Sequence, residues 1–205
     1  YNGDILSDLP LQKALETHLT SGNEATLVLR SKDGPLQVSF DERSGKIRDL
    51  GRRLLPAEDP SFLFTGIYLL NPSFLSRIPP NTKLSVVPLF IDMIHEGAQI
   101  GGVVIDEGTW WDLGSRDHIL AVHSSLAHDS TTPPPWIGVG AQIDPTAKLL
   151  GACAVGAHSK IGAGAILEDC VVWENVEIAA NSSLRGCIVT SGARVSGNHA
   201  DADLS

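Results

Sequence analysis

The most constraining feature of the chain is a repeat of aliphatic residues in its last third. Aliphatic side chains recur every six positions from Ile137, and from Val155 onward the spacing runs six-six-five, so that one turn uses 17 residues. A three-sided coil with one short strand per side accommodates this pattern, because each coil buries its apolar residues against the next. We predict a solenoid of a little over three coils across residues 137–196. Residues one turn apart would stack as Val155/Val172/Val189, Ile161/Ile178/Val195 and Leu167/Leu184.

The cysteines follow the same period. Cys153, Cys170 and Cys187 are each 17 residues apart, so we expect them to lie above one another in successive coils. A metal-binding or redox ladder is one interpretation. The other, which we favour, is that cysteine fills a small inward position as a compact hydrophobic side chain. Three cysteines do not make a disulfide framework, which is typical of a reducing compartment and predicts a cytoplasmic protein.

Residues 1–128 have a different periodicity and predict a mixed α/β domain. Strands are expected at 25–30, 66–70 and 100–105, with a hairpin formed by 36–40 and 46–50. Helices are expected after a cap at Asp8, across 86–95, and after a cap at Ser115. Alternating strands and helices favour a sheet covered by helices. A proline-rich linker would occupy 129–136, and a tail would follow at 197–205.

Charge and hydropathy exclude two classes of protein. The chain carries 15 basic and 24 acidic residues, a net charge of −9, and no basic cluster, which argues against non-specific nucleic-acid binding. The counts of basic and acidic residues are still compatible with a local basic pocket that binds phosphates. No apolar run reaches the roughly 18–20 residues of a membrane span, so we expect no membrane partner.

Two aspartates stand where chemistry is expected in an α/β domain. Asp4 follows Asn2 and Gly3 just after the end of a predicted strand, and Asp112 lies in the segment GTWWDLG at 108–114. Two carboxylates from separate strand ends are enough to hold one Mg²⁺ beside substrate phosphates. The competing interpretation is that each aspartate only caps a turn.

Short motifs in these segments carry a resemblance to a known family. YNGDIL at 1–6, ATLVLR at 25–30, VSFDERSGKI at 38–47, FTGIYL at 64–69 and TWWDLGS at 109–115 occur in the order seen in sugar-1-phosphate nucleotidyltransferases. That family includes the mannose-1-phosphate guanylyltransferases, and the repeat after the linker resembles their hexapeptide-repeat left-handed parallel β-helix. The resemblance implies the C-terminal part of a Rossmann-like nucleotidyltransferase domain followed by a left-handed β-helix.

The resemblance also implies an activity and a site. In that family, the aspartates that match Asp4 and Asp112 bind a divalent ion, which makes these two residues the expected catalytic and Mg²⁺-binding pair. The implied reaction joins a nucleoside triphosphate and a sugar 1-phosphate, with GDP-mannose the expected kind of product and pyrophosphate leaving. The exposed ends of a short solenoid need covering, so we also expect a homo-oligomer. The expected substrate-binding residues are Asn2, Gly3, Thr65, Gly66, Trp111 and Arg52.

The sequence departs from the family at two places. The Gly-rich phosphate loop that precedes the Asn-Gly-Asp motif is absent, and so is the Glu-Lys-Pro segment before Phe64. We therefore expect that the chain begins inside the nucleotidyltransferase domain and is inactive alone. Arg52 or Arg53 stands near the missing segment and can supply positive charge to a phosphate, although a solvated basic turn explains them equally.

Two other functions are compatible with the residues. A non-catalytic subunit that binds a sugar nucleotide for regulation would explain the missing phosphate loop. A hexapeptide-repeat acyltransferase would use a solenoid histidine as general base, and His158 is the candidate. His158 is expected to face outward among small residues, which is more typical of a surface histidine.

Overall fold

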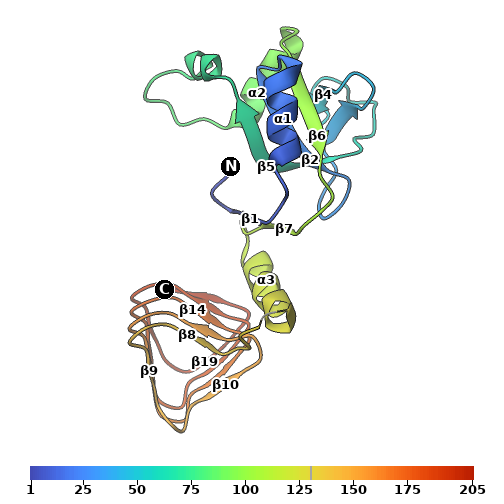
Figure 1. Cartoon of the computed structure of the whole chain (residues 1–205). Coiled ribbons are helices and arrows are strands. Elements are labelled where there is room, and N and C mark those ends of the chain that lie inside the picture. The colour runs from blue at the N-terminus through green and yellow to red at the C-terminus, as the bar shows by residue number, and fades with distance from the viewer. Residues whose placement is uncertain (130) are drawn as a thin grey trace. The chain divides into compact units, whose positions relative to one another are not determined.

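The computed structural model describes residues 1–129 and 131–205, so Ser130 of the predicted linker lies outside the described residues. The described chain forms two compact units, Tyr1–Asp112 and Leu113–Ser205, each with its own hydrophobic core (Figure 1). Within the described residues, the helices are all too short or too polar to cross a bilayer.

The first unit contains a five-stranded sheet, a two-stranded ribbon and helices. Its strands are β1(Ile5–Ser7), β2(Ala25–Arg30), β3(Val38–Asp41), β4(Lys46–Leu50), β5(Leu63–Leu70), β6(Ile100–Val104) and β7(Trp110–Asp112). Its helices are α1(Gln12–Ser21), α2(Val86–His95) and the 3₁₀ helix η1(Pro72–Arg77). The sheet order is β3-β4-β6-β2-β5, in which β2 and β6 are parallel and the other pairs antiparallel, while β1 pairs with β7.

Helices cover both faces of this sheet. On one face α1 lies across β5, β2 and β6 (Figure 1), and its buried Ala14 belongs to the same core as Val28 and Val103. On the other face, α2 contributes Phe90 and Met93 to a second core. Alternate residues of β2 thus serve opposite cores, which explains why all six residues of this central strand are buried.

The predicted α/β elements of residues 1–112 are confirmed, with two corrections. The buried strand expected just before Asp4 is not formed, because residues 1–4 are exposed and lie in a loop and a turn. The predicted strands correspond to β2, β5 and β6, the hairpin to β3 and β4, and the helix at 86–95 to α2. The predicted cap at Asp8 is wrong, because α1 begins at Gln12 after Leu11, which makes no side-chain cap. The Asp8 carboxylate instead accepts hydrogen bonds from the N–H and hydroxyl of Thr109, so it continues the contact between β1 and β7.

The second unit begins with α3(Arg116–Asp129) and continues as a parallel β-solenoid with three faces. The first face comprises β8(Trp136–Ile137), β11(Ala154–Val155), β14(Val171–Val172), β17(Ile188–Val189) and β20(Asp203–Leu204). The second face comprises β9(Gln142–Ile143), β12(Lys160–Ile161), β15(Glu177–Ile178) and β18(Arg194–Val195). The third face comprises β10(Lys148–Leu150), β13(Ile166–Glu168), β16(Ser183–Arg185) and β19(Asn198–Ala200).

The predicted stacking of aliphatic residues is confirmed. Val155 pairs with Val172 and Val172 with Val189 on the first face, and the equivalent series on the second and third faces have the predicted partners. These side chains are at most 7% exposed and form one continuous core. The period of the sequence therefore predicts the strand register directly, as expected when each coil contacts its neighbours.

The structure differs from the prediction after residue 196. The predicted tail contains β19 and β20, which complete about a fourth turn. In this turn, His199 lies beside Leu184 and Leu204 beside Val189, so each step covers 15 residues instead of 17. The shorter turn and the histidine at an aliphatic position explain why the hexad pattern does not reveal it.

Helix α3 packs against the first face of the solenoid. The outward residues of β8, β11, β14 and β17 are apolar, and Val171 and Ile188 are each only 5% exposed. The outward residue of β20 is Asp203, which lies 3.9 Å from Arg116 of α3. Arg116 donates a hydrogen bond to the Gly186 carbonyl, and the ring of His123 lies 6.0 Å from that of Trp136. The described contacts therefore place α3 in the unit that begins at Leu113, whereas the sequence places this helix before a boundary at 128.

The three cysteines are buried inside the solenoid. The cysteines directly precede β11, β14 and β17, which pair in register, so the predicted stacking is confirmed. The thiol of Cys153 donates to the Leu150 and Leu167 carbonyls, and that of Cys170 donates to Glu168. Burial raises the pKa of the Cys170 thiol to about 12 and also raises the pKa of Cys153. These features fit the compact hydrophobic role.

We expect these thiols to be unreactive in the folded protein. The raised pKa of Cys153 and Cys170 leaves little thiolate of these two residues at pH 8, and burial of all three side chains blocks access of the reagent. Labelling with Ellman's reagent at pH 8 is expected to be slow in buffer and to reach all three cysteines in denaturant. Rapid labelling of the native protein would contradict the buried, structural role.

Candidate functional site

The candidate site lies where β1 pairs with β7. Ile5 lies opposite Asp112 in this antiparallel ribbon, and Asp4 directly precedes Ile5. Opposite Cα atoms in such a pair are about 4.5–5.5 Å apart, so the two aspartates come close at the same end of the ribbon. Asp4 lies in a turn closed by a hydrogen bond from the Ile5 N–H to the Asn2 carbonyl, which takes it out of the strand alternation. Asp4 is exposed and Asp112 is half-buried.

Gly66 of β5 meets the turn that carries Asp4. The Asn2 N–H donates a hydrogen bond of 2.9 Å to the Gly66 carbonyl. Gly66 has a φ of +76°, and a Cβ at this position would lie 2.9 Å from Asn2 Nδ2 and 3.1 Å from Ile5 Cγ1. Both the backbone conformation and the close approach require glycine. The structure thus brings Asn2, Gly3 and Gly66 together with the two aspartates.

The tryptophans attach β7 to the sheet. Trp110 donates from Nε1 to the Thr65 carbonyl over 2.9 Å, and its ring packs against the core beneath α1. Trp111 is half-buried and lies opposite Leu6. Thr65 is fully buried, and its hydroxyl donates to the Val28 carbonyl. The Thr65 side chain therefore holds β5 against β2 instead of facing a ligand, which differs from its expected substrate-binding role.

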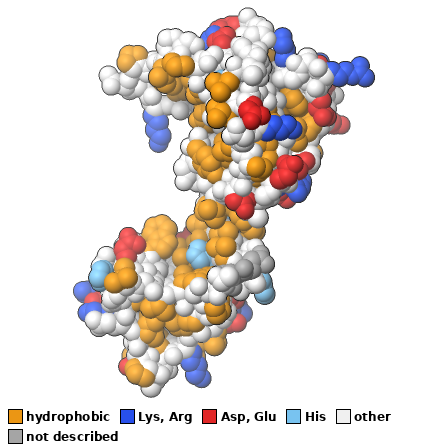
Figure 2. Space-filling model, viewed as in Figure 1, with side chains coloured by type: hydrophobic (Ala, Val, Ile, Leu, Met, Phe, Trp, Pro, Cys, Tyr) orange, Lys and Arg blue, Asp and Glu red, His pale blue; other side chains and the backbone are white. Residues whose placement is uncertain are grey.

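Arg52 is not brought into this site by the described contacts. Arg52 lies on the turn after β4, is exposed, and forms an ion pair of 2.7 Å with Asp59. On the side of the first unit shown in Figure 2, basic side chains are interspersed with acidic ones and form no patch of one sign. The prediction that Arg52 replaces the family's missing positive charge therefore gains no support from the geometry.

A buried arginine that the sequence analysis missed holds the loop before β7. Arg30, the last residue of β2, is 1% exposed and donates to four consecutive carbonyls, those of residues 105–108, over 3.1–3.4 Å. It also forms an ion pair with Asp33. An arginine that ends an otherwise aliphatic strand is the signal that could have identified it.

Further polar contacts fasten the same loop. Asp106 accepts hydrogen bonds from the N–H and hydroxyl of Ser31, and Asp8 accepts from Thr109. The hydrogen bonds from Thr109 hold the pKa of the Asp8 carboxyl below its ordinary value. Asp8 and Asp106 are therefore carboxylates with structural partners, which distinguishes them from Asp4.

The donor set of the site suits a hard divalent ion. Among the described residues, no group of three or more His, Cys, Asp or Glu side chains is arranged to hold a metal. Mg²⁺ differs from most protein-bound metals here, because it keeps several waters and needs only one or two carboxylates beside substrate phosphates. Asp4 and Asp112 place that number of carboxylates at one end of the β1–β7 ribbon.

The solenoid histidine singled out by the sequence lies on a corner. His158 is exposed, has a left-handed φ of 59°, and lies beside Gly140, where a Cβ would be 2.6 Å from His158 Nδ1. The position is that of a corner residue between β11 and β12, outside the buried core. Nothing in these contacts favours a general base.

Comparisons with known proteins were made for the whole chain. No family model matches it. "Mannose-1-phosphate guanylyltransferase 1" of Arabidopsis thaliana is 29% identical over an alignment of 185 positions that covers 82% of this chain and 48% of that protein. "Mannose-1-phosphate guanylyltransferase" of Mycobacterium tuberculosis is 27% identical over 82% of this chain and 50% of its own length. "Mannose-1-phosphate guanylyltransferase catalytic subunit beta" of Drosophila melanogaster is 28% identical over 74% of this chain and 43% of its length.

The chain thus spans about half the length of the curated relatives it matches. The matched length exceeds that of either unit taken alone, so the similarity cannot rest on the solenoid repeat only. The resemblance that the motifs indicate is confirmed: this chain, an α/β unit followed by a parallel β-solenoid, is similar to mannose-1-phosphate guanylyltransferases from a plant, an insect and a bacterium.

Proposed function

We propose that the protein containing this chain is a Mg²⁺-dependent sugar-1-phosphate nucleotidyltransferase that makes GDP-mannose and pyrophosphate from GTP and mannose 1-phosphate. The observation that carries the proposal is the pairing of β1 with β7, which brings Asp4, Asp112 and Gly66 to one place in a chain similar to guanylyltransferases. We further propose that the protein is cytoplasmic and self-associates.

Each residue of the candidate site has its own role in the proposed reaction. Asp4 and Asp112 would hold Mg²⁺, which when bound supplies positive charge to the reacting phosphates. Gly66 would place backbone groups against the sugar, and its lack of a side chain admits Asn2 and Ile5 beside it. Trp111 forms a wall of the site from β7. A phosphate oxygen of the sugar 1-phosphate attacks the α-phosphorus of the triphosphate, and the bond to pyrophosphate breaks. Such a transfer depends on positioning and charge stabilisation more than on an acid or base.

The test is an assay of the protein with its native ends. Pyrophosphate release is measured with GTP and mannose 1-phosphate, and the other common triphosphates and sugar 1-phosphates serve as a comparison panel. We expect GTP with mannose 1-phosphate to be the preferred pair, and expect EDTA to abolish turnover and added Mg²⁺ to restore it. Binding of GDP-mannose without pyrophosphate release from any pair would contradict catalysis and favour a regulatory subunit.

A further inference from the structure

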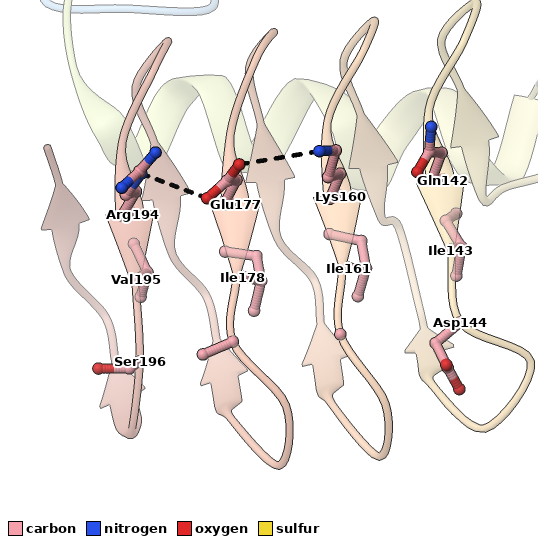
Figure 3. Close-up of a pocket in the computed structure, with 12 residues that line it drawn as sticks. Gln142, Ile143, Asp144, Lys160, Ile161, Glu177, Ile178, Arg194, Val195 and Ser196 are labelled. Carbon is pink, nitrogen blue, oxygen red and sulfur yellow. Dashed lines mark ion pairs between the residues drawn. The ribbon is translucent and has the colours of Figure 1, made fainter.

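The second face of the solenoid carries a regular row of polar side chains. One outward residue from each of its four strands lies at the same height, so that the row crosses the face at right angles to the strands (Figure 3). We call this the charged row: Gln142, Lys160, Glu177 and Arg194. Lys160 lies 3.9 Å from Glu177, and Glu177 lies 3.2 Å from Arg194. Their side chains are 46–82% exposed, so water screens these ion pairs and they contribute little to stability.

A shallow groove runs beside this row. Two residues further along each strand lies a second outward row, which we call the small row: Asp144, Gly162, Ala179 and Ser196. The charged row and the small row line a groove of about 700 Å³ (Figure 3). A Cβ on Gly162 would lie 2.6 Å from the backbone nitrogen of Ala180, so the packing of successive coils keeps this part of the groove free of side chains.

We propose that the second face binds the second face of another copy of this chain, about a two-fold axis parallel to the strands and midway between β12 and β15. This inference deepens the self-association proposed above. Neighbouring strands are about 4.8 Å apart, so this axis places each residue of the charged row opposite the residue at the mirror position in the row. Lys160 of each copy then faces Glu177 of the other copy, so this central pair forms twice per dimer. At the edges of the interface, Arg194 of each copy faces Gln142 of the other copy, and Asp144 of that other copy lies next to this Gln142.

The order of charges selects this register. If the axis ran along β15, Glu177 would face Glu177 of the second copy and Lys160 would face Arg194. If it ran along β12, Lys160 would face Lys160. Both shifted registers bring like charges together, whereas the midway axis brings opposite charges together at the centre of the interface. The alternation of charge along the row is therefore what a self-complementary surface requires.

The first face provides the contrast within the same solenoid. The outward residues of its first four strands are apolar, and Val171 and Ile188 among them are almost completely buried beneath α3. The charged row, by comparison, is exposed at Gln142, Lys160 and Arg194 and half-buried at Glu177. A polar, groove-bearing surface with weak internal ion pairs is suited to partner choice and register more than to folding of the solenoid.

Charge reversal tests the pairing directly. Sedimentation equilibrium of the protein with its native ends is expected to show a dimer or a larger assembly built from dimers. Glu177→Lys places two lysine pairs in the interface, and Lys160→Glu places two glutamate pairs there. Each single reversal is expected to weaken this association at least about tenfold, because like charges meet twice. The double variant Lys160→Glu/Glu177→Lys exchanges the charges and is expected to restore it.

The matched control is Glu168→Lys on the third face. It makes the same charge change at an exposed strand position, beside Arg185 in the neighbouring coil, and is expected to leave association unchanged. A monomeric wild-type protein would contradict self-association and this interface together. An assembly insensitive to Glu177→Lys, or one that the double variant fails to restore, would overturn the second-face interface alone. Neither result bears on the nucleotidyltransferase assay.

Discussion

Replacing Asp112 by asparagine in the protein with its native ends is expected to lower turnover with GTP and mannose 1-phosphate about a thousandfold, and Asp4→Asn to do the same. A metal ligand contributes several kcal/mol of charge stabilisation to the transition state, and about 4 kcal/mol corresponds to a thousandfold in rate. Asn keeps the shape of Asp and removes the charge, so the β1–β7 ribbon should keep its pairing. Initial rates of pyrophosphate release, measured across a range of Mg²⁺ concentrations, give the comparison.

Two features make this measurement decisive. Loss of a ligand should raise the Mg²⁺ concentration needed for half-maximal rate, a change that general misfolding would not produce. Asp92→Asn, at an exposed position on α2, removes the same charge away from the ribbon and is expected to leave turnover unchanged. A folded Asp112→Asn protein with full turnover at low Mg²⁺ would contradict the assignment of the site.

The solenoid was predictable because its contacts are regular in sequence. Each aliphatic residue contacts the residue one turn away, so the spacing of Val155, Val172 and Val189 specifies both the fold and the register. The last turn was not predictable by the same rule, because a two-residue shortening moves His199 and Leu204 off the hexad positions. The burial of the first face beneath α3 was also not predicted, because the hexad pattern describes only inward residues. The apolar residues Val171 and Ile188 point outward on this face.

The site was predictable only in part. Asp4, Asp112 and Gly66 stand in motifs, and the structure brings the segments that carry them together. Thr65 stands in a motif too, yet its hydroxyl is used within the sheet. A motif identifies a segment near the site without telling which side of the strand each residue faces. The contacts of Arg30 were beyond sequence reasoning, because all of its carbonyl partners lie on a loop about 75 residues away.

Replacing Arg30 by methionine is expected to lower the free energy of unfolding of the first unit by about 3–5 kcal/mol. Methionine fills much of the same volume but leaves the buried Ile105 carbonyl and the part-buried carbonyls of residues 106–108 without their donor. Leaving a buried hydrogen-bonding group without its partner costs about 1–3 kcal/mol, and here several carbonyls lose the same donor. The ion pair with Asp33 contributes the smaller share, because the Asp33 side chain is 41% exposed and water screens it.

The location of the damage separates this mechanism from general destabilisation. Hydrogen exchange is expected to rise first in residues 105–112 and in β1, which pairs with β7, while the solenoid keeps its protection. Arg48→Met is the matched control, because Arg48 makes a surface ion pair with Glu58 with both side chains at least 41% exposed, and its loss should cost at most about 1 kcal/mol. Equal urea denaturation curves for the two variants would contradict the role of Arg30 in holding the loop before β7. Since β7 carries Asp112, an Arg30 variant with early exchange in this segment should also lose affinity for divalent ions, which links a buried arginine to the chemistry of an exposed site.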